Sequence, residues 1–141
     1  MSSRAAQCDE DLKGRLMKMP PVVSVIMPCR DEERFITASL ESILGSTYPK
    51  DQLEILVVDG LSQDGTRSIV SRYVAEHSMI RLLDNVERTA PCALNIGIAA
   101  ATGDIIMRMD AHSLYPKNYI AGLVKWLGES GADNVGGVCM T

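Results

Sequence analysis

The amino-acid sequence predicts an α/β fold in which a mostly parallel sheet lies between layers of helices. Short apolar runs rich in β-branched residues recur along the chain, and longer stretches with helical spacing separate them. Strands that are apolar on both faces are typical of a parallel sheet covered on both sides, a Rossmann-like three-layer sandwich. Ligands of such sheets bind beyond the carboxyl ends of the strands. The segments that directly follow the strands are therefore the first candidates for function.

The individual elements follow from composition and spacing. The expected strands, the last of them weak, are Val22–Met27, Glu54–Val58, Ile80–Leu83, Asp104–Met109 and Asn134–Val138. Apolar residues three or four positions apart indicate helices between them, at Ile36, Leu40 and Ile43, at the pairs Ile69/Tyr73 and Val70/Val74, and at Ile120, Leu123, Val124 and Leu127. Strands and helices thus alternate along the whole chain.

The length and composition fit one globular domain. The chain has 141 residues, of which 46% are hydrophobic and 23% charged. We divide it into a polar N-terminal lead-in over residues 1–21 and a ligand-binding domain over residues 22–141. No stretch approaches the roughly 20 apolar residues that span a bilayer, and the lead-in lacks the apolar centre of a secretory signal. The sequence predicts no membrane span in this chain.

The charge balance argues against nucleic acid as a partner. Eighteen acidic residues against 14 basic ones give a formal net charge of -4, so a phosphate ligand would have to be held locally, by a metal or by helix ends. The cysteines are scattered and form no Cys-x-x-Cys pair, which favours free thiols in a reducing compartment. They are Cys8, Cys29, Cys92 and Cys139.

Acidic residues follow each of the first four expected strands, and a divalent metal is the economical way to compensate them. Asp110 and His112 form the sharpest pair, because residues i and i+2 of an extended chain point to the same side. A carboxylate with an imidazole suits Mn²⁺ or a similar metal better than Ca²⁺. The alternative is that Asp110 caps the following turn and His112 is simply exposed.

Two further aspartates have different expected roles. Asp59 directly follows an apolar strand, where a carboxylate faces the ligand cleft, so we expect it to take part in binding. Asp64 precedes Gly65 and Thr66 and a helical run, and is a natural helix N-cap. Ser62 fits the turn between them.

Several other residues near this edge admit two interpretations. Arg30 and Arg34 either contact a ligand or pair with the neighbouring acids on a solvated helix start. Arg88 and Arg108 can contact phosphate with two hydrogen bonds. By themselves, Asn95 and Gly97 would be taken as residues of helix surface and helix packing.

Five motifs occur in the order and spacing seen in family 2 glycosyltransferases. They are Pro28-Cys29-Arg30-Asp31-Glu32-Glu33, Val57-Val58-Asp59-Gly60-Leu61-Ser62-Gln63-Asp64-Gly65-Thr66, Ala93-Leu94-Asn95-Ile96-Gly97, Thr102-Gly103-Asp104-Ile105-Ile106 and Asp110-Ala111-His112. From about Val22 onward the chain resembles the nucleotide-binding half of these enzymes, most closely the succinoglycan type that extends bacterial exopolysaccharides. The resemblance implies the GT-A nucleotide-diphosphosugar transferase fold, incomplete at its C-terminus.

The resemblance also implies a donor site. Pro28, Arg30 and Glu32 would line the nucleobase and ribose side, and Asp59 would complete that pocket. Asp110 and His112 would occupy the family's Asp-x-Asp position and hold Mn²⁺ or Mg²⁺ against the diphosphate. The full set of implied donor-binding residues is Pro28, Arg30, Glu32, Asp59, Asn95, Arg108 and Asp110.

Three positions depart from the family pattern. His112 replaces the second aspartate, Asp31 replaces an asparagine, and Gly60 stands where many members carry a second acidic residue for the base. These departures leave the choice of nucleotide open, with a uridine diphosphate sugar as the expected donor.

The family resemblance also predicts what this chain does not supply. Family members carry a second half with the acceptor site and the catalytic base, and the present sequence reaches Thr141 about where that half should begin. No catalytic base is therefore identified here. The expected reaction is inverting transfer to a glycan or lipid-linked saccharide acceptor, in the cytoplasm, at the inner face of the membrane for the full-length protein.

Three other functions remain open on the sequence alone. A sugar-phosphate nucleotidyltransferase also places nucleotide and metal at the top of a parallel sheet, but its glycine-rich basic loop is absent after Met27. A phosphoacceptor signalling module needs a lysine after the last strand, and none follows Val135. A non-catalytic nucleotide-binding remnant is the third alternative.

Overall fold

The computed structural model describes residues 6–7, 10 and 19–137, and its centre is a four-stranded parallel sheet. The strands are β1 (Val23–Cys29), β2 (Leu53–Asp59), β3 (Ile80–Asp84) and β4 (Ile105–Arg108). Their order is β3-β2-β1-β4, so β1 pairs with β2 on one side and with β4 on the other. The first four predicted strands are confirmed, with ends that differ by at most two residues.

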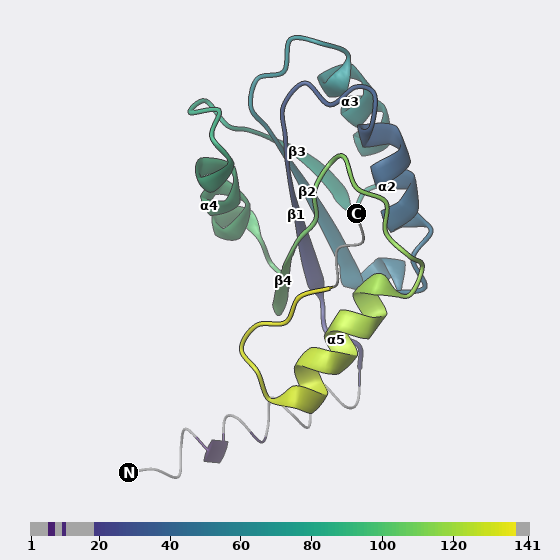
Figure 1. Cartoon of the computed structure of the whole chain (residues 1–141), viewed down its shortest axis with the longest axis vertical. Coiled ribbons are helices and arrows are strands. Elements are labelled where there is room, and N and C mark those ends of the chain that lie inside the picture. The colour runs from purple at the N-terminus through teal and green to yellow at the C-terminus, as the bar shows by residue number, and fades with distance from the viewer. Residues whose placement is uncertain (1–5, 8–9, 11–18, 138–141) are drawn as a thin grey trace.

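Helices cover both faces of the sheet, as Figure 1 shows. The helices are α2 (Ile36–Leu44), α3 (Thr66–Glu76), α4 (Ala90–Ala100) and α5 (Tyr119–Ser130), and a short 3-10 turn, η1 (Lys50–Gln52), precedes β2. Helices α2, α3 and α5 lie on one face, and α4 lies on the other. The predicted α/β class with a parallel sheet between helix layers is confirmed.

Alternation along β1 divides the core between the two faces. Val25 and Met27 point into the larger core, where they meet residues of α2 such as Leu40. Ile26, between them, points to the opposite face and packs with Ala93 of α4 in a smaller cluster. Because β1 is buried on both faces, its sequence is apolar apart from the buried Ser24.

Gly97 lets α4 approach the sheet closely. A Cβ atom at this position would lie 2.4 Å from Cγ2 of Ile26, well inside van der Waals contact. The packing interpretation of Gly97 is therefore confirmed, and the glycine is required by space rather than by backbone conformation.

The weak fifth strand is the one element that the sequence predicts wrongly. Residues 134–137 form no strand, and Val138 lies outside the described residues. Gly136 and Gly137 explain the difference, since glycine offers no side chain to pack and weakens a strand.

Most of the lead-in over residues 1–21 also lies outside the described residues. Its last residue, Pro21, accepts a hydrogen bond at 2.5 Å from the hydroxyl of Tyr48. Within the described part of the chain, no helix is long and apolar enough to cross a membrane.

Candidate functional site

The candidate site is the sheet edge at the carboxyl ends of β1 and β4. From β1 the chain crosses to β2 and β3 on one side, and β4 then pairs with the other side of β1. The strand order thus reverses between β1 and β4, the position where open α/β sheets bind their ligands. The loop after β1 and the loop after β4 flank this point.

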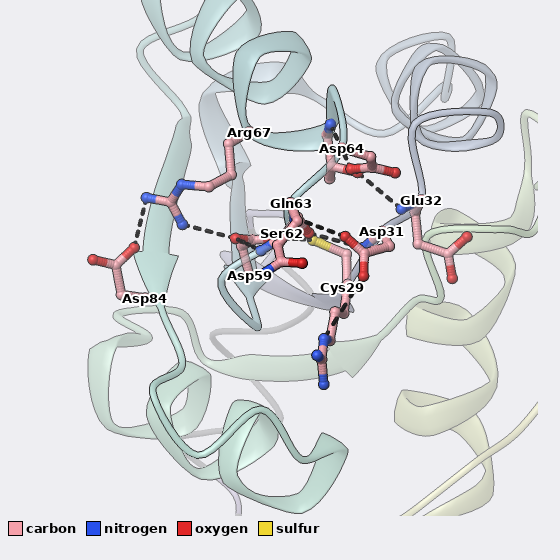
Figure 2. Close-up of polar contacts among 11 residues, drawn as sticks. Cys29, Asp31, Glu32, Asp59, Ser62, Gln63, Asp64, Arg67 and Asp84 are labelled. Carbon is pink, nitrogen blue, oxygen red and sulfur yellow. Dashed lines mark hydrogen bonds and ion pairs between the residues drawn. The ribbon is translucent and has the colours of Figure 1, made fainter.

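The loop after β1 is joined to the loop after β2 by hydrogen bonds in both directions. The amide of Asp31 donates to Oγ of Ser62 at 2.8 Å, and the amide of Gln63 donates to Oδ1 of Asp31 at 2.8 Å. Asp31 has φ 53°, a left-handed conformation that aspartate and asparagine tolerate better than most residues. An aspartate therefore meets the conformational demand of this position as the family's asparagine does. Figure 2 shows the two loops joined in this way.

Asp59 lies at the centre of this network and has no exposed side-chain surface. Its Oδ2 accepts the amide of Ser62 at 3.0 Å and Nη1 of Arg67 at 2.7 Å, and its Oδ1 accepts the hydroxyl of Ser62. Burial alone would raise the pKa of Asp59, but the hydrogen bonds from Ser62 and Arg67 outweigh it and hold the pKa below its ordinary value. Asp59 is thus an ionised, fully engaged carboxylate that supports the edge from beneath.

Cys29 shares this buried environment. Its Sγ lies 3.6 Å from Oδ1 of Asp59. Burial raises the pKa of the Cys29 thiol, and the Asp59 carboxylate beside it raises the pKa further. A thiol that stays protonated is a poor nucleophile, so Cys29 is a packing residue. Of the two cysteines that the structure describes, Cys29 and Cys92, both are free thiols, while Cys8 and Cys139 lie outside the described residues.

Asp64 begins helix α3 in a different way from the predicted N-cap. The cap position is Gly65, and Asp64 stands one residue before it. Its Oδ1 accepts the amide of Thr66 at 2.9 Å, and its Oδ2 accepts the amide of Glu33 at 3.2 Å. Asp64 therefore supports the start of α3 as predicted, but from the position before the N-cap. Its contact with the amide of Glu33 also joins the loop after β1 to the start of α3.

The loop after β4 carries the predicted metal pair. Oδ1 of Asp110 accepts Nε of Arg108 at 3.0 Å, and the carbonyl of Asp110 accepts the hydroxyl of Ser39 at 3.1 Å. The amide of Asp110 donates to the Tyr115 hydroxyl at 2.6 Å. His112 is more exposed, and its Nδ1 lies 3.1 Å from Oε1 of Glu32. Helix α2 and Tyr115 therefore fix the backbone of this loop, while both side chains remain partly accessible.

Asp110 and His112 fit a divalent cation only as a partial ligand set. Within the described residues, no group of three or more His, Cys, Asp and Glu side chains could hold an ion. A carboxylate and an imidazole are ligands that Mn²⁺ accepts, and a small cation bound with a diphosphate takes its other ligands from phosphate and water. The donor chemistry therefore fits an ion held jointly by the protein and a diphosphate.

The remaining predicted residues divide into two groups. Arg30 is exposed beside Asp31 on the first loop, with 3.8 Å between the charged atoms, and Pro28 is partly buried near the end of β1. Asn95 is exposed in the middle of α4, and among the described residues no hydrogen bond joins its side chain to the edge. The structure thus brings Glu32 and His112 together and leaves Asn95 apart.

Sequence reasoning missed Arg67. This side chain donates to Asp59 and, through Nη2, to Oδ1 of Asp84 at 2.8 Å, so that it joins the ends of β2 and β3 (Figure 2). The only signal in the sequence is its place in the first turn of the helix that follows the Asp59 strand. That position places the guanidinium of Arg67 within reach of the strand end, but it does not show which carboxylate Arg67 pairs with.

Taken together, the strand order and the paired loops define an α/β domain whose strand order reverses at the β1 and β4 edge, the position where sheets of this kind bind their ligands. The chain belongs to glycosyl transferase family 2, whose model matches residues 24–141. The fold is accordingly the GT-A fold expected from the motifs.

Relatives with curated names agree with this assignment. The chain is 35% identical over 113 residues to the succinoglycan biosynthesis protein ExoA of Rhizobium meliloti (strain 1021). The aligned residues make up 79% of this chain and 34% of ExoA. It is 32% identical over 118 residues to the glycosyltransferase AglE of Haloferax volcanii, covering 83% of this chain and 39% of AglE. The chain therefore spans between a third and two fifths of the length of these relatives.

Solved structures share the fold. The mannosyltransferase PcManGT from Pyrobaculum calidifontis, in complex with GDP-Man and Mn²⁺, matches with a TM-score of 0.72 and 35% identity over 86% of this chain and 39% of that one. The S. aureus protein TarS in complex with UDP-GlcNAc matches with a TM-score of 0.69 and 25% identity, over 79% of this chain and 32% of that one. The family assignment favours glycosyl transfer over the nucleotidyltransferase and phosphoacceptor alternatives.

Proposed function

We propose that this chain binds a nucleoside diphosphosugar together with Mn²⁺ or Mg²⁺, as the donor half of an inverting glycosyltransferase. The observation that carries the proposal is the convergence of Glu32, from the loop after β1, and the Asp110-Ala111-His112 segment, from the loop after β4, at the point where the strand order reverses. The complex of PcManGT with GDP-Man and Mn²⁺ supports this ligand class, since that protein matches most of this chain.

The charges of the edge explain why a metal is part of the proposal. Arg67 is shared between Asp59 and Asp84, and Nε of Arg108 donates to Asp110, so both guanidinium groups already compensate carboxylates of the edge. A diphosphate that approaches Glu32 and Asp110 is repelled by their carboxylates unless a further cation lies between them. When bound, the ion would supply Lewis-acid stabilisation of the departing diphosphate.

The residues of this chain have separate roles in the proposed site. Asp110 and His112 hold the ion, while Arg30 and Pro28 lie beside the nucleobase and ribose. Asp59 acts from below, by fixing the first two loops through Ser62. Arg108 orients Asp110 before the ion binds that carboxylate. Within the part of the chain that the structure describes, Asn95 makes no hydrogen bond to the edge, and it would reach the donor from α4.

The acceptor and the cellular setting are extensions of this proposal. An acceptor hydroxyl from a glycan or lipid-linked saccharide would displace the diphosphate at the anomeric carbon. The free thiols of Cys29 and Cys92 support a reducing compartment such as the cytoplasm, with the full-length protein at the inner face of the membrane.

Calorimetry with UDP and with GDP, each in Mn²⁺, in Mg²⁺ and in chelator, tests the proposal. We expect a diphosphate nucleotide to bind with metal and to lose most of its affinity in chelator. Equal affinity in chelator would overturn the metal-bridged site, and no nucleotide binding under any condition would overturn donor binding. Tighter binding of GDP than UDP would reverse our preference for a uridine donor and leave the donor class intact.

A further inference from the structure

A contact between Glu32 and His112 joins the two loops of the candidate site. The two residues are 80 positions apart, and Nδ1 of His112 lies 3.1 Å from Oε1 of Glu32. Glu32 has 22% of its side chain exposed and His112 has 59%. The contact therefore forms at the mouth of the site rather than in the core, on the line where the strand order reverses.

The chemistry of the pair fixes the tautomer of the histidine. An ionised carboxylate only accepts hydrogen bonds, so the contact requires the proton of His112 to be on Nδ1. The lone pair of a neutral ring is then on Nε2, the nitrogen that does not face Glu32. Histidines that ligate metals usually donate their other ring N–H to a carboxylate or carbonyl in this way, which sets both the tautomer and the ring orientation.

We propose that Glu32 is a positioning residue that holds His112 with Nε2 presented to the divalent cation of the donor site. This inference rests on the proposed function, because it assumes that His112 meets the ion. It gives Glu32 a role through His112 in addition to the nucleobase and ribose side that the family resemblance implies.

Both partners stand on backbone that the structure holds in place. The amide of Glu32 donates to Oγ1 of Thr66 at 2.8 Å, and its carbonyl accepts the amides of Phe35 and Ile36 at 2.9 Å each as α2 begins. On the other side, Ala111 is buried next to His112. A hydrogen bond between two such anchored residues orients a ligand without a large further loss of conformational entropy.

The neighbouring Glu33 shows that the contact is specific to one carboxylate. Its Oε2 accepts the amide of Gly65 at 2.7 Å, so Glu33 serves the joint between the first loop and α3. The two glutamates carry the same charge on the same loop but have different partners. Glu33→Gln is therefore a matched control that removes an equal charge and leaves the histidine contact alone.

The tautomer can be read directly by nitrogen NMR of the imidazole rings at pH 8. The chain has two histidines, His77 and His112, so assignment needs one variant and His77 serves as an internal reference. We expect His112 to carry its proton on Nδ1 in the parent protein and in Glu33→Gln, and to lose this preference in Glu32→Ala. A parent without the Nδ1–H form, or a Glu32→Ala variant that keeps it, would overturn the positioning role.

Mn²⁺ titration in the presence of UDP gives the second measurement. We expect Glu32→Ala to lower the affinity for Mn²⁺ by about 10-fold to 100-fold, the usual effect of removing a carboxylate behind a metal-bound histidine. Glu32→Gln, whose amide oxygen still accepts the Nδ1 proton, should retain more affinity than Glu32→Ala. The double variant Glu32→Ala/His112→Ala should have nearly the same affinity for Mn²⁺ as His112→Ala alone, because Glu32 acts through His112.

The outcomes separate the two proposals. No Mn²⁺-dependent binding by the parent protein would overturn the proposed function and, with it, the purpose assigned to Glu32. Normal Mn²⁺ binding by the parent and by Glu32→Ala would overturn the positioning role alone. An equal loss in Glu33→Gln and Glu32→Ala would also overturn it, because the effect would then be one of charge.

Discussion

Nη1 of Arg67 donates to Oδ2 of Asp59 across 2.7 Å, and that carboxylate has no exposed surface. Nη2 of the same guanidinium donates to Asp84 at 2.8 Å, so one side chain of α3 ties together the carboxyl ends of β2 and β3. A buried carboxylate needs such a partner to stay ionised. The interaction therefore supports this edge of the sheet from its interior rather than forming part of its surface.

Arg67→Gln should destabilise the fold by removing this partner. Loss of a hydrogen bond to a charged, buried group lowers the free energy of unfolding by about 1.5–3 kcal/mol, and we expect the lower end because Arg67 is 35% exposed. Urea unfolding measures the change. Arg72→Gln, an exposed substitution on the same helix, is the control and should have an effect below about 0.5 kcal/mol. Equal stabilities for the two variants would contradict the supporting role of Arg67.

The lowered pKa of Asp59 predicts a stability that falls in acid. Its folded-state pKa lies below the unfolded value of about 3.9. The ionised form therefore contributes stability above the unfolded pKa, and this contribution is lost as the pH falls through the folded-state pKa. Glu54 adds in the same direction: burial raises its pKa, but hydrogen bonds from Ser24 and Thr102 outweigh this and lower it. Asp59→Asn should be less stable than the parent at pH 7 and lose less of its stability on acidification.

Unfolding free energies at several pH values between about 7 and 3 measure this difference. Glu54→Gln should flatten another part of the profile, independently of Asp59, because the two residues lie at opposite ends of β2. An Asp59→Asn profile parallel to that of the parent would show that Asp59 does not titrate with folding.

The sequence predicts the sheet well and the contacts of the site only in part. Strands buried on both faces leave an apolar run that is readable in one dimension, so β1 and β2 were expected within two residues of their observed ends. The same rule correctly placed Asp59 and Asp110 at the carboxyl edge. Which way a carboxylate at a strand end turns depends on partners brought by the fold. The expectation that Asp59 faces the cleft therefore missed its burial beneath Arg67.

Contacts between distant loops have no local signature. The meeting of Glu32 with His112 spans 80 positions, and neither residue has neighbours that indicate the other. The weak strand around Asn134 failed for a local reason, since the glycines that follow oppose the strand that Val135 favours. Local chemistry thus predicts the elements, and the tertiary fold decides how polar side chains are paired.

Gly97→Ala should destabilise the protein although alanine is the better helix former. The gain in helix propensity is about 1 kcal/mol, whereas a Cβ at 2.4 Å from Ile26 forces α4 off the sheet at a cost of about 1–3 kcal/mol. Gly122→Ala is a matched control in α5, because no atom lies within 4 Å of the added Cβ. We expect thermal unfolding to show a lower midpoint for Gly97→Ala and a higher one for Gly122→Ala. A higher midpoint for Gly97→Ala would contradict this prediction and show that α4 can move away from the sheet at little cost.

Asp110→Ala should abolish metal-dependent nucleotide binding and leave the fold nearly unchanged. The contacts that hold this loop, to Ser39 and Tyr115, are made by the backbone of Asp110, so they survive loss of the carboxylate. We expect the affinity for UDP in Mn²⁺ to fall by more than about 100-fold, since loss of a ligand should exceed the effect of losing a residue behind one. The thermal midpoint should stay close to that of the parent, because the substitution is outside the core.

Asp64→Ala should give the opposite pattern and serves as the control for Asp110→Ala. Asp64 supports the start of α3 and accepts the amide of Glu33, so its loss should lower the thermal midpoint. Nucleotide affinity should change much less than in Asp110→Ala, because Asp64 is not among the residues assigned to the ion. Calorimetry and thermal unfolding on the same samples measure both quantities. If Asp110→Ala unfolds the chain while its folded fraction still binds UDP normally in Mn²⁺, Asp110 is a turn residue, as the alternative interpretation of the sequence has it.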